Sequence, residues 1–202
     1  MAKQNIVIIK YNAGNIRSVN NALLRVGYDA EITADPEKIR SADKVIFPGV
    51  GEASTTMRYL NDSGLADIIV SLKQPVLGIC LGMQLMGSFS EEGGVKCLGV
   101  FNEEVRKFKL PDTNSDNLKI PHMGWNRIFD LKSDLFDASL EGQYVYFVHS
   151  YYVAHGVDTA ATTDYILNYS SALQKDNFFA TQFHPEKSGP VGQRILENFL
   201  KL

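Results

Sequence analysis

Residues 75–84 read PVLGICLGMQ, and the rest of the chain is organised around this stretch. Its first half is a short apolar run, which is typical of a buried strand. The run ends at Cys80, which stands between Gly78 and Gly82 and is followed at once by a helical pattern of apolar residues. This G-x-C-x-G arrangement is typical of a nucleophile elbow, a sharp strand-to-helix turn that lifts a reactive side chain clear of a sheet.

The glycines and the place of the cysteine each have a physical reason. Neighbouring backbone comes too close at such a turn to leave room for a Cβ atom. The thiol of Cys80 lies at the predicted N-terminus of a helix, where the helix dipole and unpaired N–H groups favour thiolate over thiol. The alternative is a buried structural cysteine, which is common in proteins. The elbow alone leaves both interpretations open.

Length and composition indicate one domain over residues 1–202. Hydrophobic residues make up 45% and charged residues 21%, and the net charge of −3 gives no reason to expect nucleic acid or an anionic membrane as a partner. No apolar run approaches the roughly 18 residues that span a bilayer, and the N-terminus carries no signal-peptide pattern. A nucleophilic Cys80 would leave it and Cys97 without a structural disulfide, which favours a reducing cytoplasm.

The first half of the chain alternates predicted strands and helices. The predicted strands are 5–10, 28–33, 44–47 and 75–80, and the predicted helices are 16–26, 35–40, 53–61, 65–72 and one from residue 81. This order indicates an α/β fold with a mostly parallel central sheet and helices on both faces. Ligands bind at the carboxyl ends of strands in such sheets. Both Cys80 and the loop Pro48-Gly49-Val50-Gly51 are predicted to lie at such ends.

The second half does not alternate strands with helices; strands are predicted at 99–108, 125–129, 144–148, 165–169 and 178–183. A polar loop at 111–118 separates the first two, and a helix at 189–202 closes the chain. We expect these strands to be antiparallel additions that extend the sheet or cover one edge.

A nucleophilic cysteine needs a base, and His184-Pro185-Glu186 offers one. Proline at 185 favours extended geometry at His184, and residues i and i+2 of an extended chain project to the same side. His184 and Glu186 therefore form, with Cys80, a predicted Cys-His-Glu triad. The alternative is a surface turn that contains a histidine by chance. The other histidines are weaker candidates: His122 is placed in a loop, and His149 and His155 lack a neighbouring acid. No spacing of histidines and cysteines suggests a metal site.

Acyl transfer also needs donors for an oxyanion. The elbow offers the backbone N–H of Leu81, and the loop at 48–51 offers that of Val50, because the glycines on either side let this peptide turn over at little steric cost. The alternative for this loop is an ordinary tight turn.

Elbow, glycine loop and His-Pro-Glu, in this order over about 200 residues, resemble the class I (triad) glutamine amidotransferases, which have a flavodoxin-like fold. Within that family the chain is similar to the glutaminase subunits of imidazole glycerol phosphate synthase. The residues that carry the resemblance are Tyr11-Asn12-Ala13-Gly14-Asn15, Pro48-Gly49-Val50-Gly51-Glu52, Gly78-Ile79-Cys80-Leu81-Gly82-Met83-Gln84, Pro121-His122-Met123-Gly124-Trp125-Asn126, Phe147-Val148-His149-Ser150-Tyr151 and Gln182-Phe183-His184-Pro185-Glu186-Lys187-Ser188.

The resemblance implies that Cys80 attacks the side-chain amide of glutamine and that His184 gives a proton to the departing ammonia. Water then hydrolyses the γ-glutamyl thioester, and no cofactor takes part. The residues that it implies for glutamine binding are Gly49, Gly51, Gln84, His149 and Ser150.

The resemblance also implies a partner, a cyclase subunit with a (β/α)8 barrel that receives the ammonia and makes imidazole glycerol phosphate in histidine biosynthesis. Candidates for the docking face are Met123, Trp125, Tyr146 and Lys187, although Met123 and Tyr146 would also suit core packing and Lys187 simple solvation. Two rival functions remain. A glutaminase of another synthase, such as that of pyridoxal phosphate, is disfavoured by the 48–51 loop and by Met-Gly-Trp. A non-catalytic module on the same fold is disfavoured by the intact His-Pro-Glu.

Overall fold

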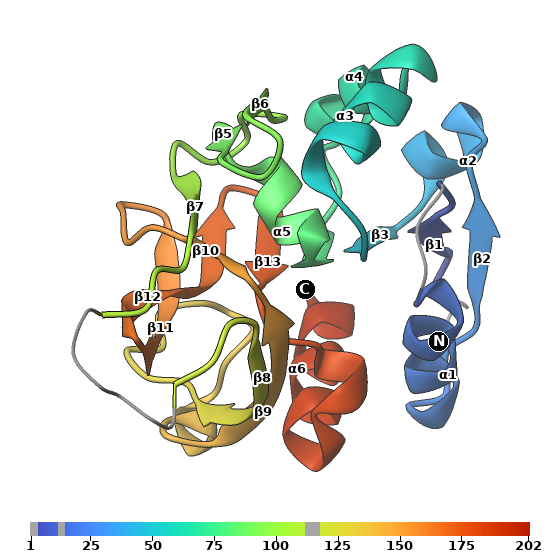
Figure 1. The fold of residues 1–202 in the computed structure, drawn as a ribbon. Helices are drawn as coiled ribbons and strands as arrows, with labels where there is room; N and C mark the ends of the chain where they lie inside the picture. Colours follow the sequence, from blue (N-terminus) through green and yellow to red (C-terminus); the bar gives the residue numbers. More distant parts are fainter. Residues whose placement is uncertain (1–3, 12–14, 112–117) are drawn as a thin grey trace.

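The computed structural model describes residues 4–11, 15–111 and 118–202. The predicted turn at residues 12–14 and most of the predicted polar loop, residues 112–117, lie outside these ranges. Within them the chain forms one large mixed sheet, a separate two-stranded sheet and six α-helices (Figure 1). None of these helices is long and apolar enough to span a membrane.

The parallel part of the large sheet matches the pattern predicted for the first half. Its strands lie in the order β2 (Ala30–Thr33), β1 (Ile6–Ile9), β3 (Lys44–Gly49), β4 (Val76–Cys80) and β13 (Phe178–Thr181). Each neighbouring pair is parallel, including β4 with β13, which comes from the far end of the chain. The carboxyl ends of β3, β4 and β13 therefore meet at one edge of the sheet.

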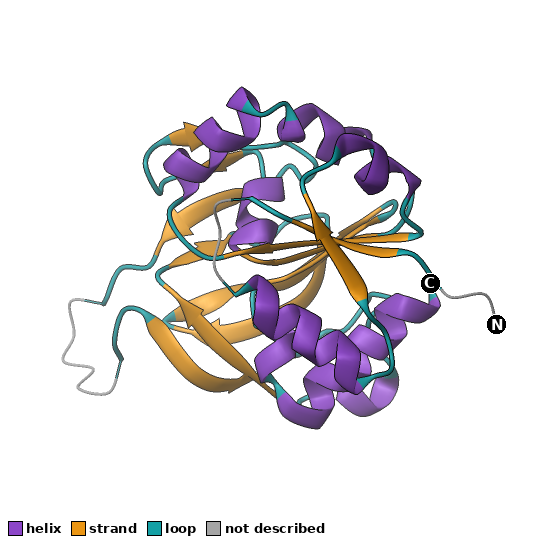
Figure 2. Ribbon diagram, turned by 90° about the vertical axis from the view of Figure 1, so that its right-hand side faces the viewer, coloured by secondary structure: helices purple, strands orange, loops and turns teal. Residues whose placement is uncertain are grey.

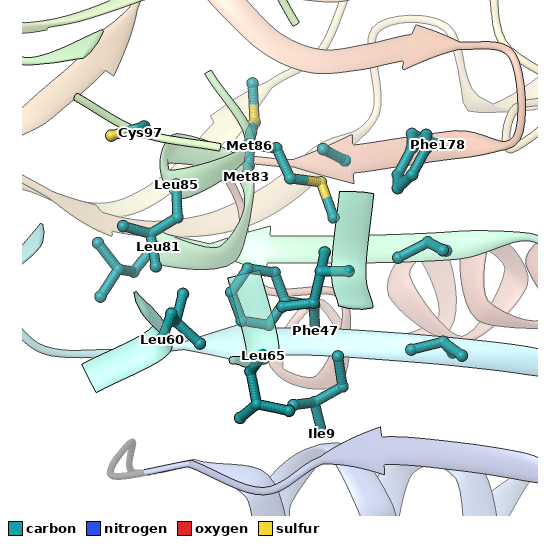
Figure 3. Close-up of a cluster of buried hydrophobic side chains, with 14 of the residues drawn as sticks. Ile9, Phe47, Leu60, Leu65, Leu81, Met83, Leu85, Met86, Cys97 and Phe178 are labelled. Carbon is teal, nitrogen blue, oxygen red and sulfur yellow. The ribbon is translucent and has the colours of Figure 1, made fainter. Parts of the chain in front are cut away.

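Helices cover both faces of this sheet (Figure 2). Because side chains alternate along a strand, Val7 and Ile9 pack on one face while Ile6 and Ile8 pack on the other. The first face is covered by α2 (Pro36–Ser41), α3 (Ala53–Asp62), α4 (Leu65–Ser71) and α5 (Leu81–Met86), and the second by α1 (Ile16–Arg25) and α6 (Gly189–Lys201). Figure 3 shows the buried cluster of the first face, which includes Cys97.

The second half extends the sheet with shorter strands. Beyond β13 lie β12 (Leu167–Lys175), β10 (Tyr151–Val153), β7 (Glu104–Lys107), β5 (Phe89–Ser90) and β6 (Val95–Lys96), and β11 (Thr159–Tyr165) pairs with β12. All these pairings are antiparallel except that of β5 with β7. The remaining strands, β8 (His122–Arg127) and β9 (Tyr144–His149), pair only with each other. Two short 3-10 helices complete the list, η1 (Ala138–Leu140) and η2 (Pro185–Lys187).

Three strand predictions in this half were wrong. The predicted strand 178–183, which ends at Thr181 as β13, is not an antiparallel addition, because it pairs in parallel with β4 inside the sheet. The predicted strand 99–108 is shortened to β7, because the backbone N–H groups of Leu98, Gly99 and Phe101 donate to the open carbonyls at the end of α5 and beyond. The predicted strand 165–169 contains a hairpin turn, since Tyr165 pairs with Leu167 across Ile166, whose φ is 62°. Residues before this turn belong to β11 and those after it to β12. The strands β5, β6 and β10 were not predicted.

Candidate active site

Cys80 is the last residue of β4, and α5 begins at the next residue. Its φ and ψ are 55° and −110°, a combination that L-residues rarely adopt and that functional sites often contain. The turn is so tight that a Cβ atom on Gly82 would lie 1.9 Å from the carbonyl oxygen of Phe47 on β3. The strand-to-helix turn thus has the strained, glycine-dependent geometry of a nucleophile elbow.

His184 and Glu186 lie at the carboxyl end of β13, next to the elbow. His184 is extended, with φ −99° and ψ 96°, and precedes the short helix η2 that contains Glu186. Its ring Nδ1 lies 2.7 Å from Oε1 of Glu186, and both side chains are buried. The side chain of Asn15 donates to the same Oε1. The opposite ring nitrogen, Nε2, is buried and finds no hydrogen-bond partner among the described residues.

The charge state of His184 is set by competing effects. Burial disfavours a charged ring, but the hydrogen bond to Glu186 and the negative charges of Cys80 and Glu186 outweigh it and raise the pKa of His184 to about 10. The ring therefore carries a proton at neutral pH. Cys80 and His184, which were predicted as a triad with Glu186, line the same pocket at the carboxyl ends of β4 and β13, and Glu186 contacts the His184 ring.

A pocket of about 330 Å³ opens over the sulfur of Cys80. Nine of the predicted site residues line it: Val50, Gly51, Cys80, Leu81, Gln84, His149, Ser150, His184 and Lys187. Four residues that sequence reasoning did not assign also line it: Glu92, Pro121, Val148 and Tyr151. Within the part of the chain that the structure describes, no cluster of three or more His, Cys, Asp or Glu residues could hold a metal ion.

The loop at 48–51 lies directly beside the elbow. Gly49 ends β3 and is the register partner of Cys80. A Cβ atom on Gly49 would lie 2.6 Å from the hydroxyl of Tyr11 and 2.8 Å from the backbone nitrogen of Gly82. Gly49 is thus needed for space, and its close approach brings Val50 to the pocket wall. The hydroxyl of Tyr11 donates to the carbonyl of Pro48 at 2.6 Å and fixes the start of this loop.

His149 lines the pocket, but its ring nitrogens are already engaged. Nδ1 lies 2.7 Å from the carbonyl oxygen of Tyr151, and Nε2 lies 3.2 Å from the hydroxyl of Tyr169 and from Nδ1 of His122. Burial lowers the pKa of His149 to about 3 and that of His122 to about 4. Both rings are neutral and belong to a buried aromatic cluster. The loop predicted at His122 was wrong, because this residue begins β8 and pairs with His149.

The four predicted docking residues form one strip beside the pocket. Met123 and Trp125 alternate with buried or partly buried positions on β8 and are 63% and 54% exposed. Tyr146 of β9 is the register partner of Trp125, and its ring lies 5.9 Å from that of Trp125 and 5.9 Å from Nζ of Lys187. Lys187 also lines the pocket. Core packing therefore does not explain Met123, which is largely exposed.

Several residues of the site were missed or left without a role by sequence reasoning. Gln182 places its side-chain nitrogen 3.8 Å from the sulfur of Cys80, and Asn15 contacts Glu186. Both stand in the sequence motifs quoted above. Glu92 lies in a Glu-Glu-Gly-Gly turn that carries no recognisable signal, so only the fold could place it at the pocket.

A sequence model of the family "Glutamine amidotransferase class-I" matches residues 7–202. The chain belongs to the class-I glutamine amidotransferases. Among members of this family, the imidazole glycerol phosphate synthase subunit HisH of Bacteroides fragilis is 60% identical over 197 residues, which cover 98% of this chain and 99% of that protein. A HisH subunit of Pasteurella multocida is 48% identical, with 98% of each chain covered.

Two solved structures share the fold of this chain at low sequence identity. PurLQS from Thermotoga maritima has a TM-score of 0.71 at 17% identity, with 98% of each chain covered. A second structure, described as a glutamine amidotransferase, has a TM-score of 0.71 at 18% identity, with 96% of this chain and 97% of that chain covered. The predicted α/β fold with a mostly parallel centre and antiparallel additions is thus confirmed for this family.

Proposed function

We propose that this protein is the glutaminase subunit of an imidazole glycerol phosphate synthase. It hydrolyses glutamine to glutamate and ammonia and passes the ammonia to a cyclase subunit. The observation that carries the chemistry is that Cys80 at the elbow shares one pocket with His184, whose ring Nδ1 lies 2.7 Å from Oε1 of Glu186. Identity of 60% to a HisH subunit over nearly the whole chain supports the choice of synthase. Residues 1–202 would act as one glutamine amidotransferase domain.

The first half of the reaction forms a thioester. The ring of His184 already carries the proton, so Cys80 attacks the side-chain amide carbon of glutamine as a thiolate. We assign the stabilisation of the negative charge on the amide oxygen to the backbone N–H groups of Leu81 and Val50, two residues that line the pocket. His184 then protonates the amide nitrogen, and ammonia leaves as the carbon–nitrogen bond breaks.

The second half releases glutamate. His184, now neutral, takes a proton from water, and the hydroxide attacks the thioester carbon. The carbon–sulfur bond breaks, the sulfur leaves as a thiolate while His184 keeps its proton, and Cys80 is ready for a new cycle. Glu186 holds the ring by Nδ1 throughout and stabilises its positive charge.

Two acceptors in the pocket suit the α-ammonium group of glutamine. The side-chain nitrogen of Gln84 donates to the carbonyl of Tyr151 and to Oε1 of Gln182, so its own oxygen is left for a ligand. Oε2 of Glu92 accepts from the N–H of Ala53, so Oε1 is left. Burial, and then the charge of Glu52, raise the pKa of Glu92, and a bound cation would favour its ionised form.

The strip of Met123, Trp125, Tyr146 and Lys187 is proposed as part of the docking face for the cyclase barrel. Exposed Met and Trp side chains are typical of the centre of a protein interface, and the strip adjoins the pocket in which ammonia is released. Both cysteines are free thiols, which suits a reducing compartment, so we place the protein in the cytoplasm.

Affinity purification of the protein from its host, followed by identification of the copurified chain, tests this proposal. A (β/α)8 cyclase should copurify, and the pair should make imidazole glycerol phosphate from glutamine and the cyclase substrate. Recovery of a pyridoxal phosphate synthase subunit instead, with no activity toward the cyclase substrate, would contradict it. A Cys80→Ala variant should still bind the cyclase, and that complex should make imidazole glycerol phosphate only when ammonium is added. This result would separate binding of the cyclase from hydrolysis of glutamine.

A further inference from the structure

A chain of buried amide groups connects the pocket wall with the sulfur of Cys80. The side-chain nitrogen of Gln84 donates to the backbone carbonyl of Tyr151 at 3.0 Å and to Oε1 of Gln182 at 2.9 Å. The side-chain nitrogen of Gln182 then lies 3.8 Å from Sγ of Cys80. Gln182 and Gln84 are both buried. In this hydrogen-bond network of Tyr151, Gln84, Gln182 and Cys80, every amide group except the oxygen of Gln84 is thus directed at another residue of the network.

The direction of this chain is fixed by its first member. A backbone carbonyl can only accept, so Gln84 must turn its nitrogen toward Tyr151. The second hydrogen of that nitrogen points at Gln182, which must therefore present its oxygen to Gln84 and its own nitrogen to Cys80. The carbonyl of Tyr151 also lies 2.7 Å from Nδ1 of His149, which anchors it from the other side.

The fold holds Gln182 beside the elbow. It follows β13 directly, and Thr181, the last residue of β13, is the register partner of Ile79 on β4. The backbone N–H of Gln182 donates to the carbonyl of Ser171 at 2.9 Å. Because β4 and β13 are parallel, the residues that follow Ile79 and Thr181, Cys80 and Gln182, lie next to each other.

We propose that Gln182 is a positioning residue for the nucleophile, and that its side-chain amide holds the sulfur of Cys80 and donates a hydrogen bond to the thiolate. The catalytic purpose of this hydrogen bond rests on the proposed glutaminase function, whereas the experiment that tests the hydrogen bond does not. With the proton on His184, the thiolate sulfur of Cys80 is a buried anion, and a buried anion needs donors. A neutral amide supplies one without competing for the proton.

Other groups also act on this sulfur. His184 faces it from the residue before η2 and Tyr11 from the end of β1, since Cys80 contributes to the pKa shifts of both. Glu92 and Lys187 face the same pocket. The carbonyl oxygen of Val148 lies 4.0 Å from Sγ and is an acceptor, which cannot stabilise a thiolate. The amide of Gln182 offsets this unfavourable neighbour.

Alkylation of Cys80 by iodoacetamide measures this effect directly. The thiolate attacks the iodine-bearing carbon and expels iodide, so the rate follows the fraction of thiolate. The full-length protein is treated without glutamine or partner between pH 5 and 10, and modification is followed by mass spectrometry of the peptide that contains Cys80. Gln182→Met keeps the length of the side chain and removes the donor. Gln182→Glu keeps the acceptor that Gln84 needs and puts an anionic oxygen toward the sulfur.

We expect the pH of half-maximal alkylation to rise by about one unit in Gln182→Met, which is about a tenfold slower reaction below that pH. The rise in Gln182→Glu should be at least as large. Thr181→Val is the matched control: it removes a buried hydroxyl, which donates to the carbonyl of Phe183 at 3.1 Å, one residue away. It should leave the pH profile of Cys80 unchanged.

An unchanged pH profile in a folded Gln182→Met or Gln182→Glu protein would overturn the proposal, and so would an equal shift in Thr181→Val. Circular dichroism identifies the folded variants, and Gln182→Glu, which is nearly isosteric, decides the question where Gln182→Met does not fold. Because alkylation needs neither glutamine nor cyclase, a protein that shows the shift without any glutaminase activity would refute the proposed function and leave the role of Gln182 intact. In the active complex, the Met variant should lower kcat about tenfold with KM within about twofold.

Discussion

Replacing Glu186 by glutamine removes a charge from the triad and keeps its shape. Oε1 of Glu186 accepts from Nδ1 of His184 at 2.7 Å and from the side chain of Asn15. With two donors directed at this position, the new amide should place its oxygen there and hold the ring. What is lost is the negative charge beside a buried, protonated imidazole.

The magnitude follows from the difference between charged and neutral hydrogen bonds. Hydrogen bonds to charged groups contribute about 1.5–3 kcal/mol and neutral ones about 0.5–1.5. The difference of about 1–2 kcal/mol corresponds to a roughly 5- to 30-fold lower kcat/KM. His184→Ala removes the acid and base itself and should cost at least about a hundredfold. Glu186→Gln should thus be the milder of the two variants.

The pH dependence has a definite sign. The pKa of His184 is raised to about 10 in the folded protein from its ordinary value of 6.5. Its contribution to stability is therefore fully present below about pH 6.5 and is lost as the pH rises through about 10. In Glu186→Gln the folded pKa of His184 should fall by about one unit. The high-pH decline of both activity and thermal stability should then begin about one unit lower.

The assay is steady-state glutamate production by the complex with the cyclase, between pH 6 and 10.5, together with thermal unfolding of the isolated chain over the same range. The stability advantage of wild type over Glu186→Gln should keep its full size up to about pH 9 and should vanish above about pH 10. Near-wild-type turnover in His184→Ala would remove the triad from the mechanism. An unmoved high-pH decline in Glu186→Gln would refute the assigned role of the carboxylate.

Three further predictions concern the nucleophile, the elbow and the coupling to the partner. A glutamine-mimicking electrophile should label the protein once, at Cys80, and Cys80→Ala should abolish hydrolysis while the fold survives; mass spectrometry that finds the label on Cys97 would exclude the assignment. Gly82→Ala should lower the free energy of unfolding by about 3 kcal/mol or more and Tm by about 6–12 °C. Gly78→Ala should lower Tm by less in the same melting experiment, because the atom nearest to its new Cβ is a flexible methionine sulfur at 2.9 Å. The isolated chain should hydrolyse glutamine at least about a hundredfold more slowly than the complex with cyclase ligand bound, because we expect the partner to turn the Val50 peptide so that its N–H, and not its carbonyl, faces the oxyanion. Gly51→Val should reduce this activation because φ at Gly51 is 128°. A lone subunit at full rate in a steady-state assay would refute this turn of the Val50 peptide.

The parts of the site that sequence could predict are those that short stretches encode. The elbow is contained in residues 78–82, and the pairing of His184 with Glu186 follows from two positions on either side of one proline. Strands and helices of the first half followed from apolar periodicity, most clearly for β1, β3 and β4, which are covered on both faces. None of these inferences required knowing which strands are neighbours.

The missed contacts depend on strand neighbours. Gln182 meets Cys80 only because β13 inserts beside β4, and Asn15 meets Glu186 because α1 packs near η2. Likewise, no local pattern indicates that the N–H groups of residues 98–101 would complete the end of α5 and shorten the predicted strand. Sequence patterns specify elements, whereas these contacts depend on the order of strands in the sheet.

Burial turns out not to distinguish the two cysteines. Cys80 is 8% exposed and Cys97 is 5% exposed, so a buried position describes both equally well. Burial, and then the charge of Glu92, raise the pKa of Cys97 to about 12, and its thiol donates to the carbonyl of Val95 at 3.8 Å. Around Cys80 the same burial is combined with a protonated imidazole and an amide donor. A buried thiol becomes a nucleophile when its neighbours are hydrogen-bond donors and a base, and it stays unreactive when they are acceptors and an acid. The His-Pro-Glu motif therefore predicted the role of Cys80 better than its burial could.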